Sequence, residues 1–148
     1  DVYKRQMLYK ECLRIIQKKM PKVIVFENVK GLLSTKYIDG RNLAEVIVED
    51  LSTMNGVGYN VVHQLVNASD YGVPQNRERV FCISELEIKS DFVFPEPTEL
   101  KFKLEDILEK DVDERYYLNN GQVMDKPIKQ EYSYCLDSNY WKGLPFRN

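Results

Sequence analysis

The sequence has few of the residues on which several common kinds of site depend. Its three cysteines, Cys12, Cys82 and Cys135, are far apart and form no CxxC pair, which argues against a disulfide framework and against a zinc site. Its single histidine, His63, lies in an alternating stretch that is typical of a strand. We therefore expect reduced thiols and no bound metal, and we interpret His63 as a strand residue that faces solvent or a neighbour, not as part of a hydrolase dyad.

Long apolar runs are missing as well. The longest uninterrupted run, VIVF at residues 23–26, is far shorter than the roughly 20 residues that span a bilayer, and no signal-peptide pattern opens the chain. The 148 residues are 43% hydrophobic and 30% charged, which suits one domain with a real core, or one domain and a piece of another. We therefore expect a globular, cytoplasmic protein with no membrane partner.

Two segments have the 3.6-residue apolar period of an amphipathic helix, residues 7–20 and residues 43–54. The apolar sides that this period predicts consist of Leu8, Cys12, Ile15 and Ile16 in the first helix, and of Leu43, Val46, Ile47 and Leu51 in the second. Residues 1–6 add nothing to this period. We therefore interpret them as a non-native leader that lies outside the domain.

Three apolar segments predict strands. The run at residues 22–29 does not alternate, which is typical of a strand that is covered on both faces of a parallel α/β sheet. Too few residues separate the segments 59–68 and 79–84 for a crossover helix, so we expect these two strands to run antiparallel. The predicted fold class is α/β, with an antiparallel strand pair at the edge of the sheet.

Two polar motifs accompany these strands. FENVKG, at residues 26–31, places Glu27 at the C-terminal edge of a buried strand. PQNRERVF, at residues 74–81, places Arg77 and Arg79 two residues apart, where a strand would put both on one face. Open α/β sheets bind ligands outside the carboxyl ends of their strands. Each motif alone is more typical of an exposed surface, but their combination predicts a site.

The text FENVKGLL followed by NASDYGVPQNRERVF closely resembles two ordered motifs of the cytosine-C5 DNA methyltransferases, the Glu-Asn-Val motif and the Gln-x-Arg-x-Arg motif. The resemblance implies the C-terminal half of a Rossmann-like sheet of an S-adenosylmethionine-dependent methyltransferase. It further implies that residues 7–90 belong to the catalytic domain. Residues 91–148 would then form a connector and the beginning of the target-recognition region, which starts a second domain.

In that family a cysteine thiolate adds to C6 of a flipped cytosine, and C5 then accepts the methyl group of S-adenosylmethionine. By resemblance, Glu27 binds N3 and the exocyclic N4 of the base and supplies a proton. Arg79 contacts O2, and Arg77 positions the acid through charge-assisted hydrogen bonds. Gln75, Arg77 and Arg79 are the expected nucleic-acid contacts, and Gln75 also shapes the strand ends together with Asn28. The cytosine must leave the duplex for this chemistry.

The chain also departs from the family pattern. None of its cysteines follows a proline, so the Pro-Cys nucleophile is not among them, and all three are interpreted as structural. The Gly-rich turn that would bind the cofactor is absent too, so we assign no cofactor-binding residue. We expect a fragment that is inactive alone, completed by the N-terminal half of the same enzyme and acting on double-stranded DNA in a restriction-modification system. A tRNA cytosine-C5 methyltransferase and a non-catalytic nucleic-acid-binding module remain as alternatives.

Overall fold

The fold was analysed in a computed structural model, which describes residues 2–86, 91–113 and 131–134. The chain divides into two compact units. The first consists of Asp1–Val66 and Glu78–Glu96, and the second of Asn67–Arg77 and Pro97–Asn148. We describe each unit by itself. The domain boundaries that the sequence suggests, after residues 6 and 90, stay predictions.

Two helices of the first unit follow the predicted segments closely. Helix α1 covers Val2–Lys19 and so begins five residues before the predicted start, whereas α2 covers Leu43–Ser52. Asn42 caps α2, because its side-chain Oδ1 accepts a hydrogen bond of 2.9 Å from the backbone N–H of Ala44. The predicted inward residues of α2 are all buried, namely Leu43, Val46, Ile47 and Leu51. The prediction for this helix is therefore confirmed.

The predicted apolar side of α1 is wrong for three of its four residues. Leu8 and Ile15 are 68% and 54% exposed, and Cys12 is exposed too. The residues that pack against the core are instead Tyr9, Leu13, Ile16 and Met20. This set has the same helical period as the predicted one. It faces the core because the Tyr9 ring lies edge-on to Phe26 and the Tyr9 hydroxyl donates a hydrogen bond of 2.7 Å to Asp50.

The adjacent residues Ile15 and Ile16 offer a direct test of this orientation. Ile16→Ala should lower the free energy of unfolding by roughly 1–2 kcal/mol, because its half-buried side chain contacts the core. Ile15→Ala should leave it nearly unchanged, since that side chain is already exposed. Both substitutions change helix propensity equally, so the difference isolates burial. Urea denaturation of the two variants measures it, and equal losses would contradict the orientation.

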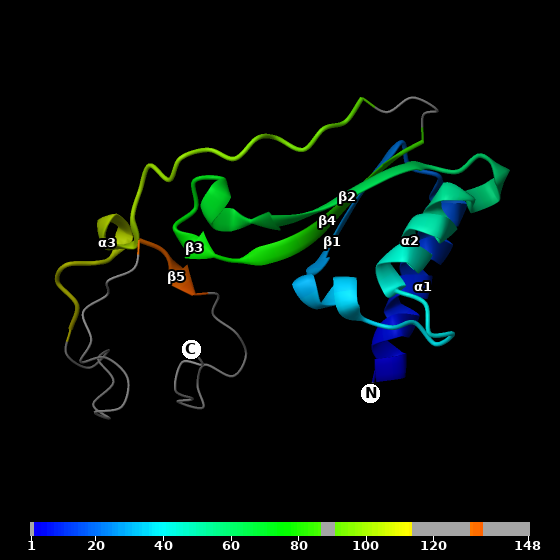
Figure 1. Cartoon of the computed structure of the whole chain (residues 1–148), viewed down its shortest axis with the longest axis horizontal. Helices are drawn as coiled ribbons and strands as arrows, with labels where there is room; N and C mark the ends of the chain where they lie inside the picture. The colour runs from blue at the N-terminus through cyan, green and yellow to red at the C-terminus, as the bar shows by residue number, and fades with distance from the viewer. Residues whose placement is uncertain (1, 87–90, 114–130, 135–148) are drawn as a thin grey trace. The chain divides into compact units, whose positions relative to one another are not determined.

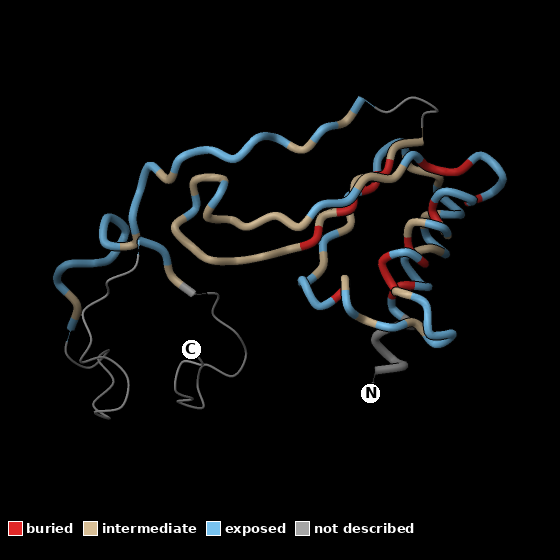
Figure 2. The backbone as a smooth tube through the Cα atoms, in the orientation of Figure 1, coloured by how far each residue is buried: buried red, intermediate tan, exposed pale blue. Residues whose placement is uncertain are grey.

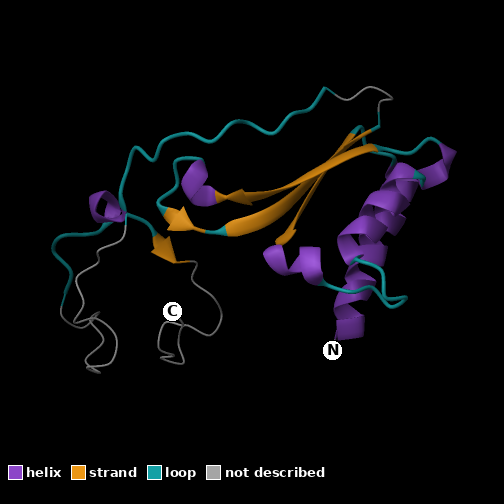
Figure 3. Ribbon diagram, in the orientation of Figure 1, coloured by secondary structure: helices purple, strands orange, loops and turns teal. Residues whose placement is uncertain are grey.

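The sheet of the first unit has three strands in the order β1-β4-β2. Strand β1 covers Val23–Val29, β2 covers Asn60–Asn67 and β4 covers Glu78–Glu85. The middle strand β4 runs antiparallel to its neighbours, with Val23 opposite Glu85 and Val29 opposite Arg79. The predicted antiparallel pair is confirmed: β2 is an outer strand of the described sheet, and β4 pairs with it on one side and with β1 on the other. Helices α1 and α2 lie together on one side of this sheet (Figures 1 and 3).

Only one face of β1 is covered in the part of the chain that the structure describes. Ile24 is buried and Phe26 packs against the core, together with Val80 and Cys82 of β4. The alternate side chains point to the other face, where Val23 and Val25 are 53% and 64% exposed. The expectation that both faces are covered is therefore wrong for the described residues, because both helices pack on the same side. Figure 2 shows the buried positions concentrated between these helices and the strands.

Short connections complete the first unit. A 3₁₀ helix, η1, follows β1 at Lys30–Ser34, and another, η2, follows α2 at Met54–Gly56. Gly58 leads into β2 with φ +73°, and a Cβ added there would lie 2.0 Å from the carbonyl oxygen of Ser52. Only glycine fits at this position, which brings the chain back from the end of α2 to the sheet.

The second unit contains small elements. Its 3₁₀ helix η3 covers Ala68–Asp70, and strand β3, at Gln75–Asn76, pairs in parallel with β5, at Ser133–Tyr134. A single helical turn, α3, covers Leu104–Ile107.

Candidate active site

A carboxylate and a guanidinium meet near the C-terminal end of β1. Glu27 lies opposite Phe81 in the strand register, and Arg79 lies two pairs further along, opposite Val29 and on the same face of the sheet. The Nε of Arg79 is 3.0 Å from Oε1 of Glu27, so the two predicted residues form a salt bridge across the strands. The Arg79 side chain is 18% exposed and that of Glu27 is 45% exposed. The arginine is therefore largely buried, and the carboxylate remains accessible to a ligand.

A further hydrogen bond orients the arginine. Nη1 of Arg79 donates to the backbone carbonyl of Glu78 at 2.7 Å, so two sides of the guanidinium are held by the protein. A planar guanidinium held in this way presents its remaining N–H groups in a set direction. Arg79 is thus held in a fixed orientation beside the Glu27 carboxylate.

Lys30 and Glu78 form a second ion pair beside the first, and sequence reasoning did not find it. Nζ of Lys30 is 2.9 and 3.0 Å from the two carboxylate oxygens of Glu78. The pair joins the segment after Glu27 to the strand that carries Arg79. Both side chains are exposed, so the pair contributes less than about 1 kcal/mol to stability. In the sequence, only the opposite charges of Lys30 and Glu78 indicate this ion pair. Whether the two side chains meet depends on the register of the strands, which the sequence does not give.

The end of β1 is shaped by Asn28, whose Oδ1 accepts a hydrogen bond of 2.8 Å from the backbone N–H of Val29. Its neighbour Phe26 packs on the core side against Tyr9. Since residues alternate along a strand, Phe26 and Asn28 face one side of the sheet and Glu27 the other. Packing of Phe26 therefore holds Glu27 on the uncovered face.

The other two predicted residues, Gln75 and Arg77, belong to the second compact unit. Arg77 is half-buried and lies in the break between β3 and β4, so the expectation that one strand presents both arginines is wrong. Its backbone explains the break: its N–H donates to Oδ1 of Asn67 at 2.8 Å and its carbonyl accepts from the N–H of Ala68 at 3.1 Å. Of the four predicted residues, the structure thus brings Glu27 and Arg79 together. Gln75 and Arg77 belong to the other unit, so no contact between them and Glu27 is described.

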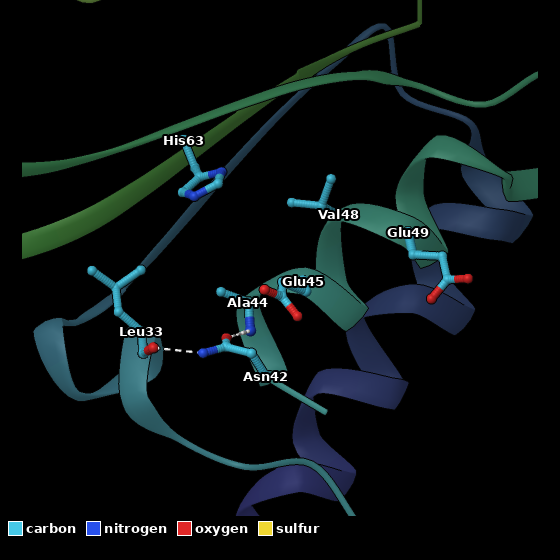
Figure 4. Close-up of a pocket in the computed structure, with 7 residues that line it drawn as sticks. All are labelled: Leu33, Asn42, Ala44, Glu45, Val48, Glu49 and His63. Atoms are coloured by element: carbon cyan, nitrogen blue, oxygen red, sulfur yellow. Dashed lines mark hydrogen bonds between the residues drawn. The ribbon is translucent and has the colours of Figure 1, made fainter. Parts of the chain in front are cut away.

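A cavity of about 380 Å³ lies elsewhere in the first unit, between α2 and β2 (Figure 4). Its lining consists of Leu33, Asn42, Ala44, Glu45, Val48, Glu49 and His63. None of the predicted site residues is among them. His63 is an exposed residue of β2, as expected. Within the described ranges no three histidine, cysteine or acidic side chains gather in a way that could hold a metal.

The cysteines within the described ranges occupy different environments. Cys82 is 3% exposed in β4 and burial raises the pKa of its thiol, which fits the predicted structural role. Cys12 is exposed on α1, and Cys135 lies outside the described residues. No helix in the described ranges is long and apolar enough to cross a membrane.

The two described thiols should differ in reactivity. The thiolate is the reactive form, so burial and a raised pKa should make Cys82 react with iodoacetamide at pH 8 roughly tenfold or more slowly than Cys12. Peptide mass mapping after brief alkylation measures both sites in one sample. Equal modification of the two thiols in the folded protein would show that β4 is not packed as described.

Likeness to known proteins gives the class of this chain. The structure resembles that of the methyltransferase EhMeth of Entamoeba histolytica with a TM-score of 0.62, at 18% sequence identity, over 90% of this chain and 43% of that one. This likeness concerns the fold alone. The family follows from the sequence: the model of the C-5 cytosine-specific DNA methylases matches residues 2–145, and the chain belongs to this family.

Curated relatives agree with this assignment. The type II methyltransferase M2.ScrFI of Lactococcus lactis subsp. cremoris is 47% identical over 139 residues, which are 94% of this chain and 37% of the relative. The type II methyltransferase M.HhaI of Haemophilus parahaemolyticus is 39% identical over 107 residues, 70% of this chain and 31% of the relative. The chain therefore spans about a third of the length of these relatives.

The family uses S-adenosylmethionine, but the described residues do not fit this cofactor. Dinucleotide and related sites rely on closely spaced glycines between a strand and a helix, because the backbone must approach the ligand there. The segment directly after β1, residues 30–34, has one glycine, Gly31, where an added Cβ would meet just Val29, at 3.9 Å. No close approach requires a glycine at this turn, so we derive no chemical step through the cofactor.

Proposed function

We propose that this chain is part of an enzyme that methylates C5 of cytosine in double-stranded DNA. The observation that carries the proposal is the salt bridge between Glu27 and Arg79, at 3.0 Å, near the carboxyl end of β1. It is supported by the family of the chain and by the names of its curated relatives, which are type II methyltransferases. Bacterial restriction-modification, in the cytoplasm, is the setting that fits such relatives.

The pair suits a flipped cytosine. Glu27 can present its carboxylic acid to N3 and to the exocyclic amino group, which together offer an acceptor and a donor. When a nucleophile attacks C6, negative charge develops on the ring, and a proton from Glu27 at N3 neutralises it. Arg79 lies within reach of the same acid and can donate to O2 of the base. Both residues act on a base outside the duplex, since its reacting face is otherwise stacked.

The remaining parts of the reaction belong to the rest of the enzyme. We assign the Pro-Cys nucleophile and the cofactor-binding turn to the N-terminal half of the same methyltransferase, because this chain has neither motif. Arg77 is proposed to position the acid, and Gln75 and Arg77 to contact nucleic acid beside it. Residues 91–148 are proposed to be a connector and the beginning of the target-recognition region.

The substrate can be tested in the completed enzyme, by which we mean this chain joined to the parts that its relatives carry outside the matched region. Bisulfite sequencing of duplex DNA and of tRNA, each incubated with this enzyme and S-adenosylmethionine, distinguishes the two nucleic acids. We expect protected cytosines in DNA at one short target sequence. Protection of tRNA alone would contradict the proposal and favour the tRNA methyltransferase alternative. Protection of neither would favour a non-catalytic module.

A further inference from the structure

The ion pair between Lys30 and Glu78 lies where the pairing of β1 with β4 ends. The register of these strands ends with Val29 of β1 opposite Arg79 of β4. Lys30 follows directly after β1, and Glu78 is the first residue of β4. Their side chains therefore meet one position beyond the backbone pair that contains Arg79. We call this ion pair the end clamp.

The geometry of the end clamp fixes the Glu78 carboxylate closely. Nζ of Lys30 lies 2.9 and 3.0 Å from the two oxygens of this carboxylate, so a single ammonium group binds both. The two side chains are 59% and 40% exposed, and an exposed pair contributes little to the stability of a whole domain. Any function of the end clamp is therefore local, at the strand end that it holds.

The Lys30 side of the end clamp is attached to a firm support. Lys30 begins η1. In this segment the carbonyl of Gly31 accepts hydrogen bonds from the hydroxyls of Ser34, at 3.1 Å, and Thr35, at 2.8 Å. Leu32 of the same segment is 6% exposed and belongs to the core. The end clamp thus ties the first residue of β4 to a segment that is anchored in the core.

Glu78 in turn holds Arg79. Its backbone carbonyl accepts the 2.7 Å hydrogen bond from Nη1 of Arg79, while Nε of the same guanidinium is 3.0 Å from Glu27. Glu78 and Arg79 are adjacent in β4, so their side chains point to opposite faces of the sheet. The side chain of Glu78 therefore binds Lys30 on one face, and its carbonyl helps to orient the arginine that pairs with Glu27 on the other.

This connection matters because Arg79 belongs to the terminal pair of the ladder. The ends of secondary-structure elements open more readily than their middles. Opening here would move the carbonyl of Glu78, and the guanidinium would lose a contact that sets its direction. A displacement of about 1 Å at an active site can cost roughly 100-fold in rate. A weak ion pair can therefore have a small effect on folding and a large effect on a reaction.

We propose that Lys30 and Glu78 are positioning residues for the methylation reaction, and that the end clamp keeps Arg79 in the orientation that serves Glu27 and the base. The inference rests on the proposed function for the identity of that base. Neither residue of the end clamp contacts the cytosine, because the Glu78 side chain points to the opposite face and Lys30 binds it there. Their effect on the rate passes through Arg79.

The first test breaks the end clamp in the completed enzyme. Lys30→Met and Glu78→Gln should each lower the single-turnover rate of DNA methylation about tenfold, less than the roughly 100-fold cost of a 1 Å displacement. The melting temperature and the affinity for duplex DNA should stay close to the parental values, because both side chains are exposed. Glu11→Gln breaks a similarly exposed ion pair, with Arg14 on α1, and should leave the rate unchanged.

Exchange of the two charges provides the rescue. The double variant Lys30→Glu with Glu78→Lys can form the same ion pair in reverse, so it should recover most of the rate that either single change loses. Lys30→Arg keeps a cation that can bind both carboxylate oxygens, so its rate should stay within about threefold of the parental rate.

A double-mutant cycle shows whether the end clamp acts through Arg79. In the Arg79→Ala background, Lys30→Met should cause no further loss of rate, because the side chain that it positions is already gone. A residue that only supports the fold would instead lower the rate about tenfold in both backgrounds.

A second measurement needs no methylation. The Nε–H of Arg79 is held at the Glu27 carboxylate, so its exchange with solvent reports the orientation of the arginine. Nuclear magnetic resonance of the completed enzyme follows this exchange, and the signal is identified by its loss in Arg79→Lys. Lys30→Met should speed the exchange about threefold or more, since the strand end opens more often. Glu11→Gln should leave it unchanged.

Several results would overturn the inference. Parental rates in both single variants, additive losses in the cycle, or unchanged exchange at Arg79 would show that the end clamp does not position the arginine. A loss of duplex affinity confined to the Lys30 variants would identify Lys30 as a phosphate contact. An enzyme that never methylates DNA, but in which exchange at Arg79 responds as expected, would refute the proposed function and leave the positioning of Arg79 standing.

Discussion

Glu27→Gln in the completed enzyme should lower the single-turnover rate of DNA methylation roughly 100- to 10,000-fold, the usual contribution of a positioned general acid. Glutamine keeps the size of the side chain and one hydrogen bond, but it has no carboxylic proton to give to N3 of the base. Because the side chain is 45% exposed, its replacement should cost little packing. The melting temperature and the affinity for duplex DNA should therefore stay close to those of the parent enzyme.

A second glutamate of the chain provides the control. Glu49 of α2 also pairs with an arginine, Arg41, and both side chains are exposed. Glu49→Gln removes the same chemical group from the same kind of pair, on α2 and away from the sheet face that carries Glu27. It should methylate at the parental rate. If Glu27→Gln also methylates at that rate, Glu27 is only a residue near the end of β1, and the other assignments at this site lose their basis.

Arg79→Ala should reduce methylation about 100- to 1,000-fold, which is typical when one preorganised donor is removed from an active site. The loss has two sources, since the Glu27 carboxylate loses its 3.0 Å partner and the base loses a donor at O2. Duplex affinity should hardly change, because most of it comes from phosphate contacts and Arg79 is proposed to contact a base. Parallel gel-shift and single-turnover measurements compare the two quantities.

Two further variants make the interpretation of Arg79 specific. Arg79→Lys keeps the charge but loses the planar fork, so it should recover only part of the rate. Arg41→Ala removes an exposed arginine that pairs with Asp39 at 2.8 Å, and it should methylate normally. Equal losses of affinity and rate in Arg79→Ala would instead identify Arg79 as an ordinary phosphate contact.

The helices show what could be predicted from the sequence and what could not. In α2 the apolar residues form one stripe after a capping asparagine, so period and cap agree and the buried face is predicted correctly. In α1 two stripes compete, one through Leu8 and the other through Tyr9. The choice is made by Phe26 and Asp50, which are distant in sequence, so the period of α1 alone cannot decide it.

The site divides in the same way. Glu27 and Arg79 were predicted because two motifs occur in a recognisable order, and the salt bridge joins them. Arg77 was assigned to the same strand by its spacing alone, but hydrogen bonds to Asn67 and Ala68 end the strand pairing there. The uncovered face of β1 was missed for a different reason: an apolar run without alternation is typical of a strand that is covered on both faces, but it does not show on which side of the sheet the helices pack.

The position of β4 between β1 and β2 has a consequence for the order of folding during synthesis. Of these three strands β1 is made first, yet its partner in the register follows about fifty residues later, a delay of several seconds at roughly 5–20 residues per second. During that interval β1 has neither β4 nor the bond from Arg79 to Glu27. Non-local pairing of this kind is slow, so the acid and its arginine reach their working geometry only when the last strand of the sheet has been inserted.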